Sequence, residues 1–164
     1  MERIEVERKP LGDVKESEFF VDASGLHYAG LASKESDKKR LFMRNANLDL
    51  LKKLKEGDFR GMRIFGPPGV GKSCLVWLWA CDESCAKNKT VLWVHLSKKG
   101  PSTAVLMKGA NIFKVKDADA DYIKSSDADI VAVDGVIESA SHEIYSLNLF
   151  TWAEFPNRKC IQVA

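Results

Sequence analysis

The sequence lacks the long apolar segments and the cysteine pairs that would tie it to a membrane or to zinc. No apolar run approaches the roughly 18 to 20 residues that a membrane helix needs, and the first nine residues are charged where a signal peptide would be apolar. None of the four cysteines forms a C-x-x-C pair, so we expect reduced, mostly buried thiols. Internal repeats and low-complexity segments are also absent. We expect a globular chain that is neither secreted nor membrane-spanning.

The sequence also lacks an excess of positive or negative charge. The 25 Lys and Arg residues nearly balance the 23 Asp and Glu residues, so the composition does not predict nucleic-acid binding. A chain of 164 residues, 45% of them hydrophobic, normally folds as one domain and buries roughly two-thirds of its unfolded surface. Intrinsic disorder and a small disulfide-stapled fold are both disfavoured.

The chain divides at Leu41 into an irregular polar segment and a segment with regular apolar spacing. Glycine and proline interrupt residues 1–40, which is typical of a linker or of the tail of a preceding domain. From Leu41, leucines recur at helical spacing as far as Leu54, and we expect this helix to end at Gly57. Residues 41–164 are expected to form the folded domain.

Short apolar segments alternate with helical ones in the rest of the chain. Residues 129–134, Asp-Ile-Val-Ala-Val-Asp, hold an unbroken apolar run, which is typical of a parallel strand covered on both faces. Further strands are expected at 61–65, 90–96 and 159–164, a hairpin at 103–116 turning near Gly109, and helical segments at 74–81 and 144–155. This alternation predicts the α/β class, with a mainly parallel sheet sandwiched by helices and an inserted β-hairpin.

One motif carries chemistry on its own. Residues 66–73 read Gly-Pro-Pro-Gly-Val-Gly-Lys-Ser and match G-x-x-x-x-G-K-[ST], the Walker A pattern. Its glycines let the backbone take turns closed to other residues, so that successive N–H groups point at phosphate oxygens. Lys72 would reach the β and γ phosphates, Ser73 would place its hydroxyl on Mg²⁺, and the next helix adds its positive dipole end. The residues expected to bind the nucleotide are Gly66, Pro67, Pro68, Gly69, Val70, Gly71, Lys72, Ser73 and Cys74.

A chance glycine-proline turn is the alternative interpretation of this motif. It is disfavoured because the motif lies between an expected strand and an expected helix, where a phosphate-binding loop belongs.

Asp134 is expected to hold the metal together with Ser73. The carboxyl end of a neighbouring parallel strand would bring its carboxylate close to the loop. A helix cap or turn acid is the alternative. In many ATPases a glutamate directly follows this aspartate and polarises the attacking water, whereas here that position is Gly135.

Because that glutamate is absent, another acid would have to polarise the attacking water. Glu138 and Glu143 are the nearest ones downstream, and Glu138 joins Lys72 and Asp134 as the expected catalytic set. Acids on a solvated helix face are the alternative for both glutamates. Without a base, the site would bind ATP yet hydrolyse it slowly.

The histidines and tryptophans carry no comparable pattern. His27, His95 and His142 occur singly, so we expect core or surface histidines rather than ligands or bases. The four tryptophans lie in expected helices and a strand, where core packing is the natural role.

Several segments together resemble a known family. They are Leu-Phe-Met-Arg at 41–44, Leu-Asp-Leu-Leu at 48–51, the loop at 66–73, Val-Leu-Trp-Val-His-Leu at 91–96 with the hairpin, and Ile-Val-Ala-Val-Asp-Gly at 130–135. This set is similar to the P-loop NTPase domain of Crinkler-type effectors, and retrotransposon hot spot proteins share its general layout. The resemblance covers about residues 40–164, and only the Walker motifs in it are highly specific.

The resemblance implies an ATPase of the additional-strand class, often joined to a nuclease-like domain. Many members are delivered into host cells by oomycete pathogens and act in the nucleus, which implies nucleic acid or a host nuclear protein as partner. The family's N-terminal Leu-x-Leu-Phe-Leu-Ala-Lys type header is not in this sequence. Gln162 is the only candidate for the polar sensor residue of the last strand, so we expect a domain that is incomplete at its C-terminus.

The sequence therefore predicts Mg²⁺-dependent binding and hydrolysis of ATP. ATP is favoured over GTP because no N-K-x-D motif is present. The alternative is a non-hydrolysing nucleotide-dependent switch for a protein or DNA partner, and a P-loop kinase is a third, weaker hypothesis. No membrane contact is expected, and the oligomeric state is left open.

Overall fold

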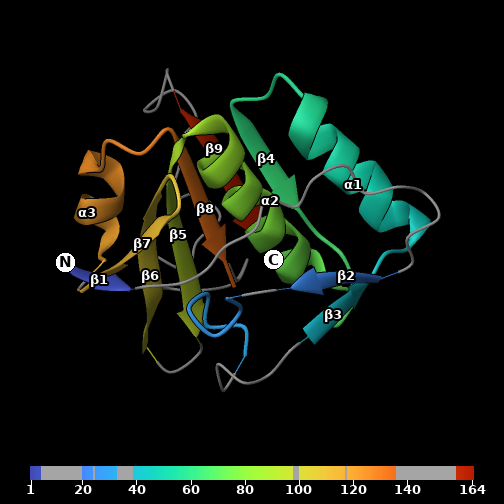
Figure 1. Ribbon diagram of the computed structural model, residues 1–164, viewed down its shortest axis with the longest axis horizontal. Coiled ribbons are helices and arrows are strands. Elements are labelled where there is room, and N and C mark those ends of the chain that lie inside the picture. Colours follow the sequence, from blue (N-terminus) through green and yellow to red (C-terminus); the bar gives the residue numbers. More distant parts are fainter. Residues whose placement is uncertain (5–19, 24, 33–38, 98–99, 117, 136–157) are drawn as a thin grey trace.

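The computed structural model describes residues 1–4, 20–23, 25–32, 39–97, 100–116, 118–135 and 158–164 (Figure 1). Its elements are β1 (Glu2–Ile4), β2 (Phe20–Ala23), β3 (Lys39–Phe42), α1 (Asn45–Glu56), β4 (Gly61–Ile64), α2 (Lys72–Lys87), β5 (Thr90–Ser97), β6 (Gly100–Lys108), β7 (Asn111–Val115), α3 (Ala120–Ser125), β8 (Ile130–Asp134) and β9 (Lys159–Val163). The expected α/β class is confirmed.

The main sheet has seven strands in the order β1-β7-β6-β5-β8-β9-β4. Strands β5, β8, β9 and β4 run parallel and form three neighbouring pairs, whereas the three pairs on the other side of β5 are antiparallel. The expected inserted hairpin is β6–β7. The prediction of a mainly parallel sheet was wrong on this point, because the hairpin and β1 make the sheet mixed.

The parallel strands bring their carboxyl ends to one edge of the sheet. Every residue of β8 is buried, as expected for a strand covered on both faces. Although β9 is last in the sequence, it lies between β8 and β4. The carboxyl ends of β4, β5 and β8 therefore lie at one edge of the sheet, which is the usual position of ligand sites in such sheets.

Helices cover both faces of the sheet. The first core cluster lies between the sheet and α1 and α2, and Figure 1 shows α2 across the central strands with α1 beyond β4. The second core cluster lies on the opposite face and includes Ile123 of α3. No helix in the described part of the chain is long and apolar enough to cross a membrane. The helix expected at 144–155 lies outside the described residues.

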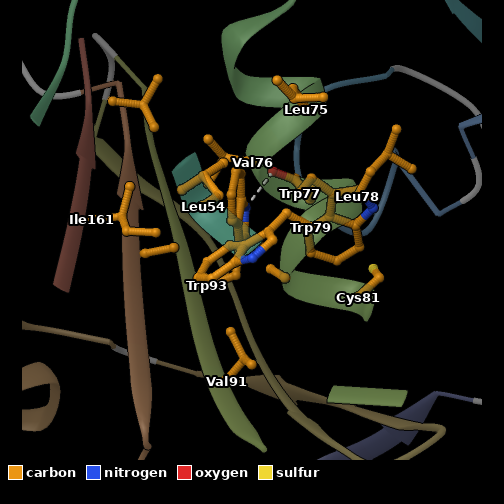
Figure 2. Packing of buried hydrophobic residues seen from close by; sticks show 14 of the residues in the cluster. Leu54, Leu75, Val76, Trp77, Leu78, Trp79, Cys81, Val91, Trp93 and Ile161 are labelled. Atoms are coloured by element: carbon orange, nitrogen blue, oxygen red, sulfur yellow. Dashed lines mark hydrogen bonds between the residues drawn. The ribbon is translucent and has the colours of Figure 1, made fainter. Parts of the chain in front are cut away.

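Helix α2 is buried along most of its length. Residues 75–84 are all buried, which fits the expectation of a helix that is apolar on every face. Trp77 packs edge-on against Trp93 of β5, with ring centroids 5.3 Å apart and planes at 77°. Figure 2 shows these side chains meeting between the helix and the sheet. The glycine loop is thus attached to α2, which has more buried residues than the other two helices of the described chain.

The structure differs from the sequence expectation around Leu41. The helix begins at Asn45 rather than near Leu41, because Leu41 belongs to β3 and pairs with Val21 of β2. Its end at Gly57 is as expected. Before residue 41, where a linker or tail is expected, β1 pairs with β7, and Leu26 and Ala29 are buried in the first core cluster.

All four cysteines are free, as expected. Cys81 and Cys160 are buried, and Cys74 and Cys85 are half-buried. Burial raises the pKa of the Cys160 thiol to about 11, although nearby Arg158 acts in the opposite direction. The expectation of mostly buried thiols therefore holds for two of the four.

Replacing Trp77 tests the packing of α2 on the sheet. Trp77→Ala leaves a cavity at the centre of the first core cluster, so we expect the free energy of unfolding to fall by about 3–5 kcal/mol in urea denaturation. Phe65→Ala is the control, because Phe65 is 56% exposed and its loss should change stability by about 0.5 kcal/mol or less. Equal stabilities of the two variants would contradict the packing.

Candidate functional site

The glycine-rich loop lies between β4 and α2, as the motif predicts. Gly71 is the N-cap of α2 and has φ +85°, a left-handed conformation that favours glycine. A Cβ at Gly71 would also lie 2.5 Å from the Leu41 side chain of β3. The first four residues of the loop, 66–69, are exposed, and the loop becomes half-buried toward Ser73.

The ammonium of Lys72 is held against the loop itself. Its Nζ donates to the carbonyl oxygens of Gly66 at 2.7 Å and of Pro67 at 2.8 Å. These bonds keep a positive charge beside the start of the loop, close to the N-terminus of a sixteen-residue helix. Both features attract an anion to the same place.

Ser73 and Asp134 meet at the edge of the sheet. Ser73 Oγ donates to Asp134 Oδ1 at 2.6 Å, although the two residues are 61 positions apart in the sequence. The strand register explains the contact, because Asp134 pairs with Val163 and Val163 pairs with Ile64, two residues before the loop. Asp134 is only 3% exposed, so its carboxylate depends on the protein for its hydrogen bonds.

His95 contacts the same carboxylate. Its Nδ1 lies 2.7 Å from Asp134 Oδ2, and the two residues are register partners in the parallel strands β5 and β8. His95 was expected to be a core or surface histidine rather than a ligand or base, and its contact with Asp134 was not predicted. A single histidine at a strand end was the only signal in the sequence, and the strand register that pairs it with Asp134 is not visible there.

Asn47 is a second residue at the site that the sequence motifs do not indicate. It is buried in α1, and its Nδ2 donates to the carbonyl oxygen of Val70 in the loop at 3.3 Å. Asn47 shares a helix face with Leu51 and Leu54, since the three are spaced by four and three residues. A polar residue within a leucine stripe was therefore the available signal.

Gly135 follows Asp134 in a conformation that other residues rarely adopt. Its φ is +80°, and a Cβ there would lie 2.3 Å from the carbonyl oxygen of Leu96. A glutamate at this position would therefore clash with β5. Glu138 and Glu143, the nearest downstream acids, lie outside the described residues.

The remaining residues predicted from the sequence differ in their position relative to Asp134. Cys74, the third residue of α2, is half-buried and packs against the first core cluster. Pro67 and Pro68 are exposed. Gln162 is buried and pairs with Val133, whereas the next residue of β9, Val163, pairs with Asp134. Because successive side chains of a strand point to opposite faces, Gln162 points to the face opposite that of Asp134. The sensor candidate thus lies on the wrong face to approach Asp134.

The metal-binding potential of the site rests on Ser73 and Asp134. No group of three or more His, Cys, Asp or Glu side chains in the described ranges could hold a metal ion. The pair instead offers one hydroxyl and one carboxylate. Mg²⁺ prefers oxygen ligands and is usually bound by one or two carboxylates with substrate phosphates and waters. These residues fit a Mg²⁺ ion that arrives with a phosphorylated ligand.

The comparisons with known proteins add no relative. No protein-family model matches this chain, and neither a curated protein nor a solved structure matches it.

Two glycines with nearly equal φ allow a matched test of the Gly135 contact. Gly69 has φ +78° and open space where a Cβ would lie, whereas Gly135 has φ +80° and a close neighbour. In each alanine variant the free energy of unfolding should fall by about 1 kcal/mol, because alanine is disfavoured in the left-handed conformation. In Gly135→Ala the free energy of unfolding, measured by chemical denaturation, should fall by about 1–3 kcal/mol more, because the added Cβ would press on Leu96. Equal losses would contradict the crowding described at Gly135.

Proposed function

We infer that this chain binds Mg²⁺-nucleoside triphosphate, with ATP as the favoured nucleotide, on residues 66–73 and hydrolyses it. The hydrogen bond between Ser73 and Asp134 carries the proposal, because it joins the phosphate-binding motif to the acid expected to hold the metal. A chance glycine-proline turn would have no reason to lie beside a buried carboxylate.

The phosphates would bind at the start of α2. Lys72 supplies an ammonium with three donors, and the helix supplies the positive end of its dipole. Anions bound at such helix N-termini are stabilised both by the dipole and by free backbone N–H groups. Asn47 supports this arrangement by holding the Val70 carbonyl.

Ser73 and Asp134 would hold the Mg²⁺ ion. A bound Mg²⁺ ion would supply positive charge that neutralises the negative charge developing on the transferred phosphoryl group. Lys72 would stabilise the same charge, and an in-line water would be the nucleophile. Because a glutamate cannot be accommodated at position 135, we expect hydrolysis to be slow.

The strand order supports a P-loop NTPase domain of the additional-strand class. One strand, β9, lies between the strand that leads to the loop and the strand that ends in Asp134. Membership of the Crinkler-type family, action in a host nucleus and a nucleic-acid or nuclear-protein partner stay proposals that rest on the sequence resemblance.

A second candidate function is a non-hydrolysing nucleotide-dependent switch. Gly135 favours it, since its crowded backbone position excludes the usual water-polarising side chain. Under this hypothesis ATP would order the site and present a surface to a protein or DNA partner.

Replacing Lys72 tests nucleotide binding. Lys72→Ala removes a charged donor, so we expect affinity for Mg·ATP to fall roughly 10- to 150-fold in titration calorimetry. Lys53→Ala, at an exposed position of α1, is the control and should bind as the unaltered chain does. Unchanged affinity in Lys72→Ala would refute the site.

Phosphate release separates the two candidate functions. The unaltered chain, at enough protein to detect turnover well below one per minute, should release phosphate from Mg·ATP (a slow rate on the usual scale of enzymes). Release that disappears in Lys72→Ala supports the ATPase. Binding of ATP without release favours the switch.

Replacing Asp134 tests the metal role. The affinity for ATP should be higher with Mg²⁺ than with EDTA, and Asp134→Asn should reduce this advantage by about tenfold or more, because a charged ligand is lost. Asp121→Asn, an exposed acid of α3, serves as the control. An advantage that survives intact in Asp134→Asn would place the metal elsewhere.

A further inference from the structure

We propose that His95 is a positioning residue for Asp134, which fixes the carboxylate in the orientation that serves Ser73 and the metal. The proposal rests on the proposed function, since it concerns the same site. His95 is not expected to touch the nucleotide, and its effect passes through the carboxylate.

Both oxygens of the Asp134 carboxylate have a partner. Oδ1 accepts from Ser73 Oγ at 2.6 Å, and Oδ2 lies 2.7 Å from His95 Nδ1. The two contacts come from different elements, one from α2 and one from β5. Together they prevent the carboxylate from rotating about its Cβ–Cγ bond.

The contact indicates which nitrogen of His95 carries a proton. A carboxylate accepts hydrogen bonds, so Nδ1 must be the donor, whatever the state of Nε2. In many metal sites a carboxylate accepts a hydrogen bond from the second ring nitrogen of a metal-bound histidine and so fixes its tautomer and orientation. Here the order is reversed, because the histidine orients the acid.

The ring of His95 is itself held by the N-terminal part of the chain. The turn at residues 25–32 lies against it, since a Cβ built on Gly30 would be 2.7 Å from His95 Cδ2. That turn is fastened to β5 by the bond from Trp93 Nε1 to the Ala29 carbonyl, 3.0 Å long. The side chain of His95 is 24% exposed. The turn at residues 25–32 therefore contacts His95, and His95 in turn contacts Asp134.

Burial makes this support necessary. Asp134 is almost fully buried, and a buried carboxylate oxygen without a partner costs free energy. Outer groups that orient metal ligands typically change metal affinity by about 10- to 100-fold when they are replaced. We expect His95 to have an effect in this range on Mg²⁺-dependent binding.

The first test needs no ligand. Long-range ¹H–¹⁵N correlation spectra of the free protein should show His95 with a protonated Nδ1, assigned by its loss in His95→Asn. In Asp134→Asn the downfield Nδ1 proton signal should weaken or disappear, because its acceptor is no longer charged. A His95 tautomer protonated at Nε2 alone would overturn the proposal.

The second test compares two replacements of His95. Asparagine can place an amide N–H close to the position of Nδ1, whereas leucine has no donor. His95→Leu should lose about tenfold or more of the Mg²⁺ advantage in ATP binding, with affinity in EDTA unchanged. His95→Asn should keep most of the advantage. Rescue by asparagine distinguishes positioning from a general loss of packing.

The outcomes separate this proposal from the function on which it rests. If the unaltered chain shows no Mg²⁺-dependent ATP binding, the proposed function fails, and the spectra of the free protein decide the role of His95. If binding is Mg²⁺-dependent and His95→Leu keeps the full advantage, the positioning role is refuted. Equal loss in the asparagine and leucine variants would also refute it.

Discussion

The hydrogen bond between Ser73 and Asp134 depends on the register of three parallel strands. Asp134 ends β8, Val163 lies level with it in β9, and Ile64 lies level with Val163 in β4. A shift of one residue in either pairing would turn side chains at this edge to the other face of the sheet. The packing of α2, with Trp77 against Trp93 of β5, fixes the helix that carries Ser73. The geometry of the site therefore depends on both the strand register and the packing of α2 in the core.

Local features of this arrangement were predictable from the sequence, and distant ones were not. The loop, the buried helix after it, the hairpin and β8 follow from motifs and apolar runs that span a few residues. The contact of His95 with Asp134 joins residues 39 positions apart, and only tertiary packing sets which strand residues lie level. Leu41 shows the same limit: its spacing fits a helix, but pairing with β2 makes it a strand residue.

The surroundings of Asp134 fit the proposed role in holding a metal better than a role in activating water. The carboxylate has one partner on each oxygen, and the backbone that follows leaves no space for a side chain at position 135. Under the proposed function, the site would bind phosphates well and promote their hydrolysis weakly, because binding and charge neutralisation would need only Lys72, Ser73 and Asp134. Residues beyond Gly135 would have to supply a base, and Glu138 stays the candidate predicted from the sequence.

The central claim is that residues 66–73 and Asp134 form one nucleotide site. Amide chemical shifts measured during titration of the ¹⁵N-labelled chain with a Mg²⁺ complex of a non-hydrolysable ATP analogue test it most directly. We expect the largest changes on residues 66–74 and on Asp134 and its neighbours in β8. Saturating changes confined to another surface, or no change at millimolar analogue, would contradict it.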